Sequence, residues 1–358
     1  MQRRELLGLA ALGLGGCAAP QLQADLQADV PPPLPASASR IAFASCAHQT
    51  LAQPIWDTIV ADKPDLHLFG GDNIYYAEPQ WTPLELHKAY ALQAAEPHFA
   101  RFRRTVPHMA VWDDNDYGAN DGGADFPYKN ESKAAFLDFF QVPMGDVRRT
   151  RGGLYDSRIF GEPGRRVQVV ILDTRWFRSP LKVTDLRGSP GKERYVPDAD
   201  PAKTMLGDAQ WGWLEEQLRQ PAEVRLIFSG IQVVADGHGW ERWGNLPLER
   251  QRLYRLIAST RANGVVLLSG DRHFGAIYRE TQATPYPLYD VTSSGLTHPW
   301  KEANEAGPNR ITDLLTELHY GMVEVDWGGR AVDLTLRDIK GAAQRRHRVP
   351  FDELRART

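Results

Sequence analysis

Carboxylate side chains follow several short apolar segments of this sequence. They stand where apolar runs typical of buried strands end: Asp72, Asp113, Asp114, Asp116 and Asp271. Carboxylates brought close together repel one another and raise each other's pKa unless cations neutralise them. Two metal ions about 3.5 to 4 Å apart can hold a phosphate ester and activate a water molecule for in-line attack. The pattern therefore predicts a polynuclear metal site, with Asp72 as the bridging ligand because the two preceding glycines let the backbone turn sharply.

Three side chains of softer chemical character accompany these carboxylates. Cys46 follows the apolar segment 41–44, Tyr75 stands three residues after Asp72, and His273 stands two residues after Asp271. A thiolate, a phenolate and an imidazole suit a transition metal such as iron or zinc, whereas oxygen ligands suit Ca²⁺ or Mg²⁺. The sequence therefore predicts a site that binds a transition metal as well as a cation with oxygen ligands.

The elements that must position these residues alternate between short apolar runs and longer amphipathic stretches, which predicts an α/β fold. Strands are expected at 41–44, 66–69, 109–112, 167–172, 224–228 and 265–268, and helices at 54–61, 83–93, 132–140, 207–220 and 246–262. Later alternating runs at 277–279, 288–291, 322–325 and 332–337 predict antiparallel strands that complete a second sheet. The proline-rich stretch 179–203 is expected to be a long irregular loop. Ligands of α/β sheets bind at the carboxyl ends of strands, where the predicted metal ligands lie.

The composition excludes several classes of protein. Of 358 residues 42% are apolar and 24% are charged, which is a globular mixture and not that of a disordered or fibrous chain. The formal net charge is −3 and no basic block alternates with aromatic residues, so no nucleic-acid-binding surface is expected. We expect the partner to be a small molecule or a metal ion.

The amino-terminal residues are typical of an export signal. Arg3 and Arg4 precede a short apolar stretch, and Leu14-Gly15-Gly16-Cys17 resembles a bacterial lipobox. The paired arginines also resemble a twin-arginine signal. We predict a signal peptide at 1–16, lipidation of Cys17, a flexible tether rich in proline and alanine at 17–39, and one folded domain at 40–358. The mature protein is then exported to the periplasm or cell surface and bound to the membrane by its lipid anchor.

Several motifs together resemble those of one known family. Gly71-Asp72-Asn73-Ile74-Tyr75, the acidic run that begins at Asp113, and Gly270-Asp271-Arg272-His273 are similar to motifs of the calcineurin-like metallophosphoesterases, in the alkaline phosphatase D (PhoD) family. Flanking strings such as Leu172-Asp173-Thr174-Arg175 and Trp243-Gly244-Asn245 are also similar to that family. The resemblance extends over about residues 41–275.

This resemblance implies a four-layer αββα sandwich that hydrolyses phosphomonoesters or phosphodiesters with a ferric ion and calcium, or other divalent metals. It implies that the metal ligands are Cys46, Asp72, Tyr75, Asp113, Asp114, Asp271 and His273. We expect the catalytic side chains beside them to be Asn115, Asp116, Arg175 and Arg272. Where relatives usually have Asp-Asp-His-Glu, this chain has Asn115 in place of the histidine, so His48 and His238 are candidates for the missing general acid.

Two other classes of protein are alternatives to a phosphoesterase. A serine hydrolase is disfavoured because the sequence lacks Gly-x-Ser-x-Gly. A non-catalytic ligand-binding lipoprotein with a metal-stabilised fold stays open as the alternative. Metal content together with hydrolysis of a chromogenic phosphodiester would distinguish it from the enzyme.

Overall fold

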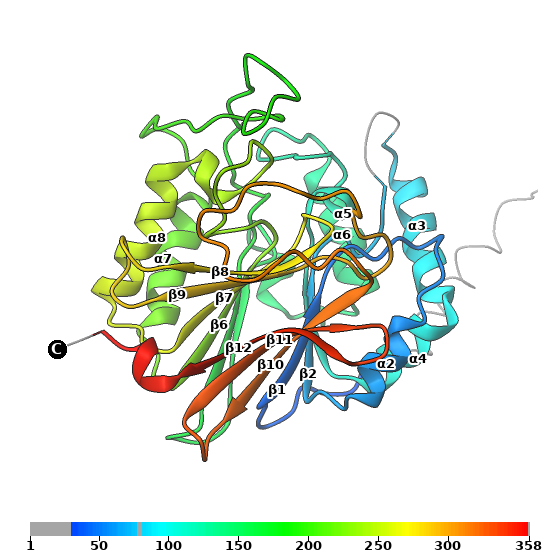
Figure 1. Cartoon of the computed structure of the whole chain (residues 1–358). Coiled ribbons are helices and arrows are strands. Elements are labelled where there is room, and N and C mark those ends of the chain that lie inside the picture. The colour runs from blue at the N-terminus through cyan, green and yellow to red at the C-terminus, as the bar shows by residue number, and fades with distance from the viewer. Residues whose placement is uncertain (1–29, 77–80, 357–358) are drawn as a thin grey trace, which may run out of the picture.

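The computed structural model describes residues 30–76 and 81–356 of the chain. Within this part, the strands form two six-stranded sheets with the orders β12-β11-β10-β1-β2-β3 and β4-β5-β6-β7-β9-β8 (Figure 1). The first sheet consists of β1 (Arg40–Ala44), β2 (Leu66–Gly70), β3 (His108–Val111), β10 (His319–Asp326), β11 (Ala331–Asp338) and β12 (Ala343–Pro350). The second consists of β4 (Asp156–Phe160), β5 (Val167–Ile171), β6 (Val224–Ser229), β7 (Val265–Ser269), β8 (Gly275–Glu280) and β9 (Leu288–Ser293). The α-helices are α2 (Ile55–Ala61), α3 (Pro83–Ala95), α4 (Pro97–Thr105), α5 (Asp114–Tyr117), α6 (Lys129–Phe139), α7 (Gly207–Leu218) and α8 (Pro247–Ser259).

The central strands are parallel and buried on both faces. β1, β2 and β3 run parallel to one another, as do β5, β6, β7 and β9. Every residue of β5, β6 and β7 is buried. Their valine, isoleucine and leucine residues are typical of strands that are covered on both sides.

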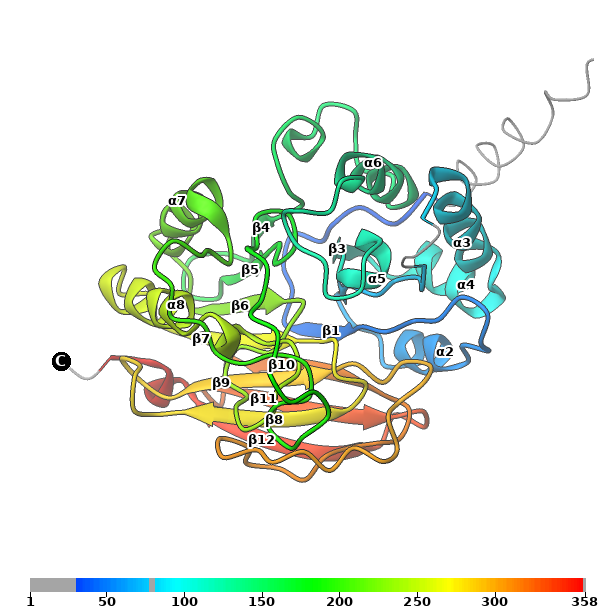
Figure 2. The ribbon, with the colours of Figure 1, turned by 90° about the horizontal axis from the view of Figure 1, so that it is seen from above.

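The two sheets pack face to face, with helices on their outer faces (Figure 2). In β7, Val266 and Leu268 belong to the core between the sheets, whereas Val265 and Leu267 belong to the core shared with α7 and α8. Phe43 of β1 meets Phe228 of β6 across the sheets, with ring centroids 5.9 Å apart. Helices α2, α3, α4 and α6 lie on the other side, over the first sheet. The predicted four-layer αββα sandwich is confirmed.

Among the strands and α-helices of the described residues, four were not predicted from the sequence: β4, β12, α4 and α5. β4 and β12 are strands at the edges of the sheets, and β12 has mostly exposed or half-buried side chains, four of them arginine or histidine. Charged side chains are common on edge strands, and they hide the apolar alternation that marks a strand in a sequence.

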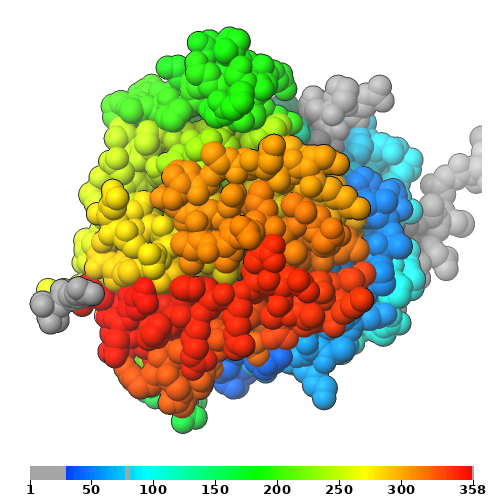
Figure 3. All heavy atoms as spheres, in the orientation of Figure 1, coloured from blue at the N-terminus to red at the C-terminus, as the bar shows by residue number. Residues whose placement is uncertain are grey.

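The 179–203 segment is irregular as expected, with only the isolated bridges Val183 to Tyr195 and Ser189 to Lys192 within it. It projects above the rest of the surface (green in Figure 3).

The predicted signal peptide and the predicted lipidation site Cys17 lie outside the described residues. From Pro31 the chain lies against the folded part, where it lines a cavity of about 290 Å³ together with α6 and β3 residues. The amide of Gly161 donates a hydrogen bond to the carbonyl oxygen of Ala36, at 2.8 Å. Among the helices of the described residues, none is both long enough and apolar enough to cross a membrane.

Candidate metal centre

The loops after β1, β2, β3 and β7 meet at one end of the two sheets. Because β1, β2 and β3 are parallel neighbours, their carboxyl ends lie at the same edge. The second sheet approaches this edge closely: a Cβ atom at Gly270, directly after β7, would lie 2.5 Å from the Oγ of Ser45. The glycine therefore lets the loop that contains Asp271 lie against the loop that contains Cys46.

This packing brings six of the sequence-predicted ligands together with Glu241 in three overlapping groups. The first group is Cys46, Asp72 and His273, the second is Asp72, Asp113 and Asp114, and the third is Asp114, Glu241 and Asp271. Within each group the ligand atoms lie within 4.8 Å of one another. Asp72 belongs to the first two groups and Asp114 to the last two, so neighbouring metal positions would share a carboxylate.

The backbone is strained at several of these residues. Cys46, Asp72, Asp271 and His273 have φ angles of 68°, 50°, 68° and 55°, in the left-handed region that side-chain-bearing residues rarely adopt. Gly71 also has a positive φ of 95°, and a Cβ atom there would lie 2.3 Å from the Cβ of Asp113. Strained backbone of this kind concentrates at functional sites, where the surrounding fold holds it in place.

The Tyr75 hydroxyl lies at the centre of the first group. It donates a hydrogen bond to Oδ2 of Asp72 at 3.1 Å and lies 3.0 Å from Nε2 of His273. The Cys46 thiol donates to the same Asp72 oxygen at 3.6 Å. Thiol, phenol, imidazole and carboxylate therefore converge on one point.

Burial and mutual repulsion disfavour negative charge on these acids. Burial raises the pKa of Asp72 well above its ordinary value, and the negative charges of Asp114 and Asp113 raise it further. Burial likewise raises the pKa of Asp271 to about 8 and that of the Cys46 thiol well above its ordinary value. Acids in this state exchange their protons for cations when cations bind. The donor set and its burial therefore fit metal ions.

Asn115 and Asp116, two of the predicted catalytic residues, have different positions. The Asn115 amide Nδ2 donates to Asp114 at 2.9 Å and to Asp72 at 3.2 Å, so it lies at the edge of the second group. Asp116 is fully buried and accepts hydrogen bonds from the backbone amides of Asp72, Asn73 and Asp113 at 3.1, 3.2 and 2.7 Å. The structure thus places Asp116 beneath the cluster, where it holds the turn that carries Asp72.

Both arginines predicted to be catalytic form ion pairs with buried carboxylates. Arg175 is fully buried and pairs with Asp113 at 2.6 Å and with Glu241 at 2.7 Å. Arg272 pairs with Glu305 and has a side chain that is only 8% exposed. Both arginines therefore balance the charge of the acidic cluster from its flanks.

The sequence of this chain is similar to those of phosphatases. The sequence model of the PhoD-like phosphatase family matches residues 41–306. The chain belongs to this family. Alkaline phosphatase D of Bacillus subtilis (strain 168) is 23% identical over 276 residues, which are 65% of this chain and 45% of that protein. The chain thus spans less than half the length of this curated relative.

Solved structures share the fold of this PhoD-like chain. The structure of PhoD has a TM-score of 0.69 at 17% sequence identity, and the match covers 88% of this chain and 73% of that one. A purple acid phosphatase from yellow lupin (Lupinus luteus) seeds has a TM-score of 0.59 at 13% identity, covering 90% of this chain and 55% of that one. At these identities the similarity establishes the fold alone.

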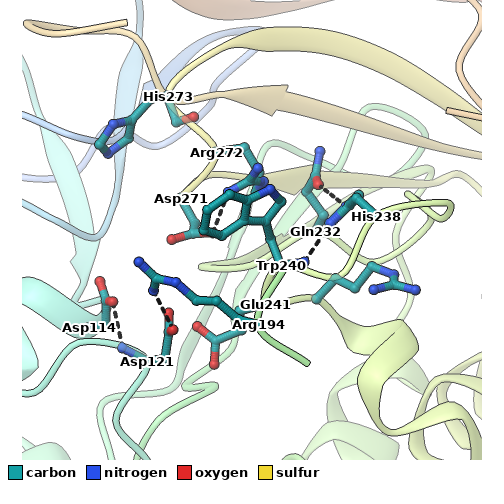
Figure 4. A network of polar contacts seen from close by, with 12 residues as sticks. Asp114, Asp121, Arg194, Gln232, His238, Trp240, Glu241, Asp271, Arg272 and His273 are labelled. Atoms are coloured by element: carbon teal, nitrogen blue, oxygen red, sulfur yellow. Dashed lines mark hydrogen bonds and ion pairs between the residues drawn. The ribbon is translucent and has the colours of Figure 1, made fainter. Parts of the chain in front are cut away.

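Glu241 and His298 are site residues that sequence reasoning missed. Neither residue lies in the PhoD-like motifs. Each stands in a loop that only tertiary packing brings to the site, so the sequence gives no signal for either. Glu241 completes the third group of ligands beside Asp114 and Asp271 (Figure 4). The His298 ring lies 4.4 Å from that of His273 and 4.6 Å from that of Tyr75, measured between centroids.

The two histidines considered as general acids occupy contrasting positions in this PhoD-like chain. His48 stacks on Tyr75, with centroids 5.0 Å apart and rings inclined by 8°. His238 is buried and lies 3.1 Å from Oε1 of Gln232, on the far side of Arg272 from His273 (Figure 4). Of the two, only His48 is adjacent to the metal-ligand cluster.

Proposed function

We propose that this chain is a metal-dependent phosphoesterase that hydrolyses phosphomonoesters, phosphodiesters or both. The observation that carries the proposal is the chain of three overlapping ligand groups linked by Asp72 and Asp114. Adjacent metal ions that share a carboxylate are the arrangement that can hold both the attacking and the leaving oxygen of a phosphate ester. Membership of the PhoD-like phosphatase family supports the same reaction class.

The ligand types support iron beside calcium. Cys46, Tyr75 and His273 supply sulfur, phenol oxygen and nitrogen, which suit iron, and Asp72 adds a carboxylate. The third group contains carboxylates only, which suit calcium. Metal ions bound there would neutralise the phosphate charge and activate water as the nucleophile.

The protein's own side chains have distinct roles in this proposal. Asp72 and Asp114 hold adjacent cations. Burial raises the pKa of Asp113, and the ion pair with the buried Arg175 opposes that rise. Asn115 presents an amide that can hydrogen-bond an ester oxygen but cannot protonate it. The buried Asp116 accepts hydrogen bonds from the backbone amides of Asp72 and Asp113 and so holds the backbone in place at both residues.

One experiment decides between the enzyme and a metal-stabilised binding protein. The protein matured in its native host is analysed for metals and assayed on nitrophenyl phosphate and on bis(nitrophenyl) phosphate. We expect iron and a second metal, with hydrolysis that chelation abolishes. Bound metal without hydrolysis of either ester would instead support the ligand-binding lipoprotein.

We further propose that the domain 40–358 is exported and anchored by a lipid on Cys17. The lipobox-like string supports this proposal. A lipid with two acyl chains plus an amide-linked chain holds a protein firmly at a membrane. The expected result is that the protein fractionates with membranes and that Cys17→Ala releases it; a variant that stays with the membranes would contradict lipidation.

A further inference from the structure

Most arginines around the acidic cluster are already neutralised by buried partners. The side chains of Arg175 and Arg178 are 0% and 1% exposed, and both pair with Glu241. Arg272 pairs with Glu305 at the opposite flank. A substrate phosphate would have to displace a buried carboxylate to bind any of them, which is costly.

Arg194, on the 179–203 loop, differs from them in its exposure. Its side chain is 30% exposed, and Nη1 pairs with Oδ2 of Asp121 at 2.6 Å. An arginine carries five N–H donors. In the described part of the chain, Asp121 is the one hydrogen-bond partner found for this guanidinium. Donors are therefore left for a ligand.

The position of Arg194 is fixed by the fold. The backbone amides of Arg194 and Tyr195 both donate to the carbonyl oxygen of Gly239, at 3.0 and 2.7 Å. The guanidinium carbon lies 5.0 Å from the centre of the Trp240 ring, within the range of a cation–π contact. A loop anchored in this way holds the guanidinium in place before a ligand arrives.

Asp121 connects Arg194 to the metal-ligand cluster. Its backbone amide donates to Oδ2 of Asp114 at 2.7 Å, and its carboxylate also accepts a hydrogen bond from the Tyr195 hydroxyl at 2.9 Å. Figure 4 shows the Arg194 guanidinium pointing into the space between Asp114, Asp121 and Asp271. This is the space beside the third group of ligands.

We propose that Arg194 contacts the substrate phosphoryl group and makes the site prefer phosphomonoesters over phosphodiesters. The inference rests on the proposed phosphoesterase function. A monoester at alkaline pH carries close to two negative charges, because its second pKa is about 6, whereas a diester carries one. A partly exposed arginine beside the third group of ligands can pair with the additional charged oxygen, as guanidinium groups do with phosphates.

The test compares Arg194→Gln with Arg187→Gln in the metal-loaded protein. Arg187 is an exposed residue of the same loop, so the control removes the same charge without changing the contacts of Arg194. We expect Arg194→Gln to lower kcat/KM for nitrophenyl phosphate by roughly 10- to 100-fold, the worth of one charged hydrogen bond. The loss for bis(nitrophenyl) phosphate should be about 3-fold or less, and Arg187→Gln should change neither.

A second measurement separates this proposal from the function on which it rests. Inorganic phosphate should inhibit monoester hydrolysis less strongly in Arg194→Gln, and calorimetry should show weaker phosphate binding to the metal-loaded variant. Arg194→Lys should restore part of the inhibition by phosphate and part of the phosphate binding. An equal loss for the two esters, or a variant that matches Arg187→Gln, would overturn the role of Arg194. A wild-type protein that hydrolyses neither ester would overturn the proposed phosphoesterase function. In that case phosphate binding still tests Arg194, and unchanged phosphate binding in Arg194→Gln would overturn its role as well.

Discussion

Cys46 combines complete burial with a strained backbone and a carboxylate neighbour. Its sulfur lies 3.6 Å from Oδ2 of Asp72 and 3.3 Å from Oγ of Ser45. Burial and the charge of Asp72 raise the pKa of the thiol, so the metal-free protein keeps it protonated at neutral pH. A cation that replaces this proton would explain why a thiol is placed among acids.

Cys46→Ser is expected to lower the affinity for iron by about 10-fold or more, and the iron content with it, because loss of even an indirect contact to a metal typically costs 10- to 100-fold in affinity. The free energy of unfolding of the metal-free protein should change by about 1.5 kcal/mol or less, since the serine hydroxyl can take over the hydrogen bonds of the thiol to Ser45 and Asp72. Elemental analysis and urea titration measure the two quantities. Full iron occupancy in the variant would remove Cys46 from the ligands.

Asn115 stands where the resemblance to the PhoD motifs leads us to expect a histidine, and this predicts a strong dependence of the rate on the leaving group. Its amide lies against Asp72 and Asp114 but has no proton to give to a departing alkoxide. General acid catalysis is worth about 10²- to 10⁴-fold. Nitrophenyl esters should therefore be cleaved far faster than alkyl esters.

Asn115→His should reduce this dependence, and Asn115→Ala, which also lacks an acid, should not. The measurement is the slope of log kcat/KM against the pKa of the leaving alcohol, for a series of esters under conditions in which chemistry limits the rate. A wild-type slope near zero would mean that another acid acts in this site.

At the scale of elements, the turn after β2 and the start of α5 depend on Asp116. Oδ1 accepts from the amides of Asp72 and Asp113, and Oδ2 accepts from the amide and the side chain of Asn73. Asp116→Asn replaces one acceptor by a donor that faces these N–H groups. We expect the free energy of unfolding to fall by roughly 2 to 3 kcal/mol and the metal affinity to fall with it.

Asp138→Asn is the matched control, because Asp138 lies on α6 with a 60% exposed side chain that pairs with Arg149. It should cost about 1 kcal/mol or less. Denaturant titration of the three proteins measures the difference. Equal stability of Asp116→Asn and Asp138→Asn would argue against a structural role for the buried carboxylate.

The elements that the sequence predicted correctly are those whose burial leaves a continuous apolar signal. β7 is Val-Val-Leu-Leu-Ser and is buried throughout, so its position and its end before Asp271 were predictable. β12 contains three arginines and a histidine at a sheet edge, and no periodicity of apolar residues reveals it. The same reason explains which site residues could be predicted. Asp72 and Asp271 directly follow buried strands and were predicted, whereas Glu241 and His298 lie in loops whose positions depend on tertiary packing and were missed.

At the scale of the whole molecule, the site exists only where both sheets are packed together. The first group of ligands takes Cys46 and Asp72 from loops of the first sheet and His273 from a loop of the second. The segment 294–318 (orange in Figure 3) reinforces this junction, because Thr297 Oγ1 donates to the carbonyl oxygen of Cys46 at 2.9 Å. Metal ions would therefore link the two sheets, and removing them should affect global stability.

The pH dependence of stability provides the test, because the buried acids have raised pKa values in the metal-free protein. Asp271 has a pKa of about 8 and Asp116 of about 7 when folded, against 3.8 ordinarily. Between pH 7 and 8 the unfolded chain therefore binds fewer protons than the folded one, so stability falls as pH rises toward 8. Buried histidines such as His67 and His319 have lowered pKa values when folded, and in the unfolded chain each releases only about a fifth of a proton between pH 7 and 8. They therefore weaken this trend without reversing its sign.

We expect chelated protein to lose roughly 1 kcal/mol or more in its free energy of unfolding between about pH 7 and pH 8, since one fully titrating group changes it by about 1.4 kcal/mol per pH unit. The metal-loaded protein should lose much less, because ligated carboxylates are already ionised in the folded state. Urea titrations of both forms at the two pH values measure the difference. Chelated protein whose stability is constant over this range would show that the acids are ionised without cations, and the electrostatic argument for a polynuclear site would then fail.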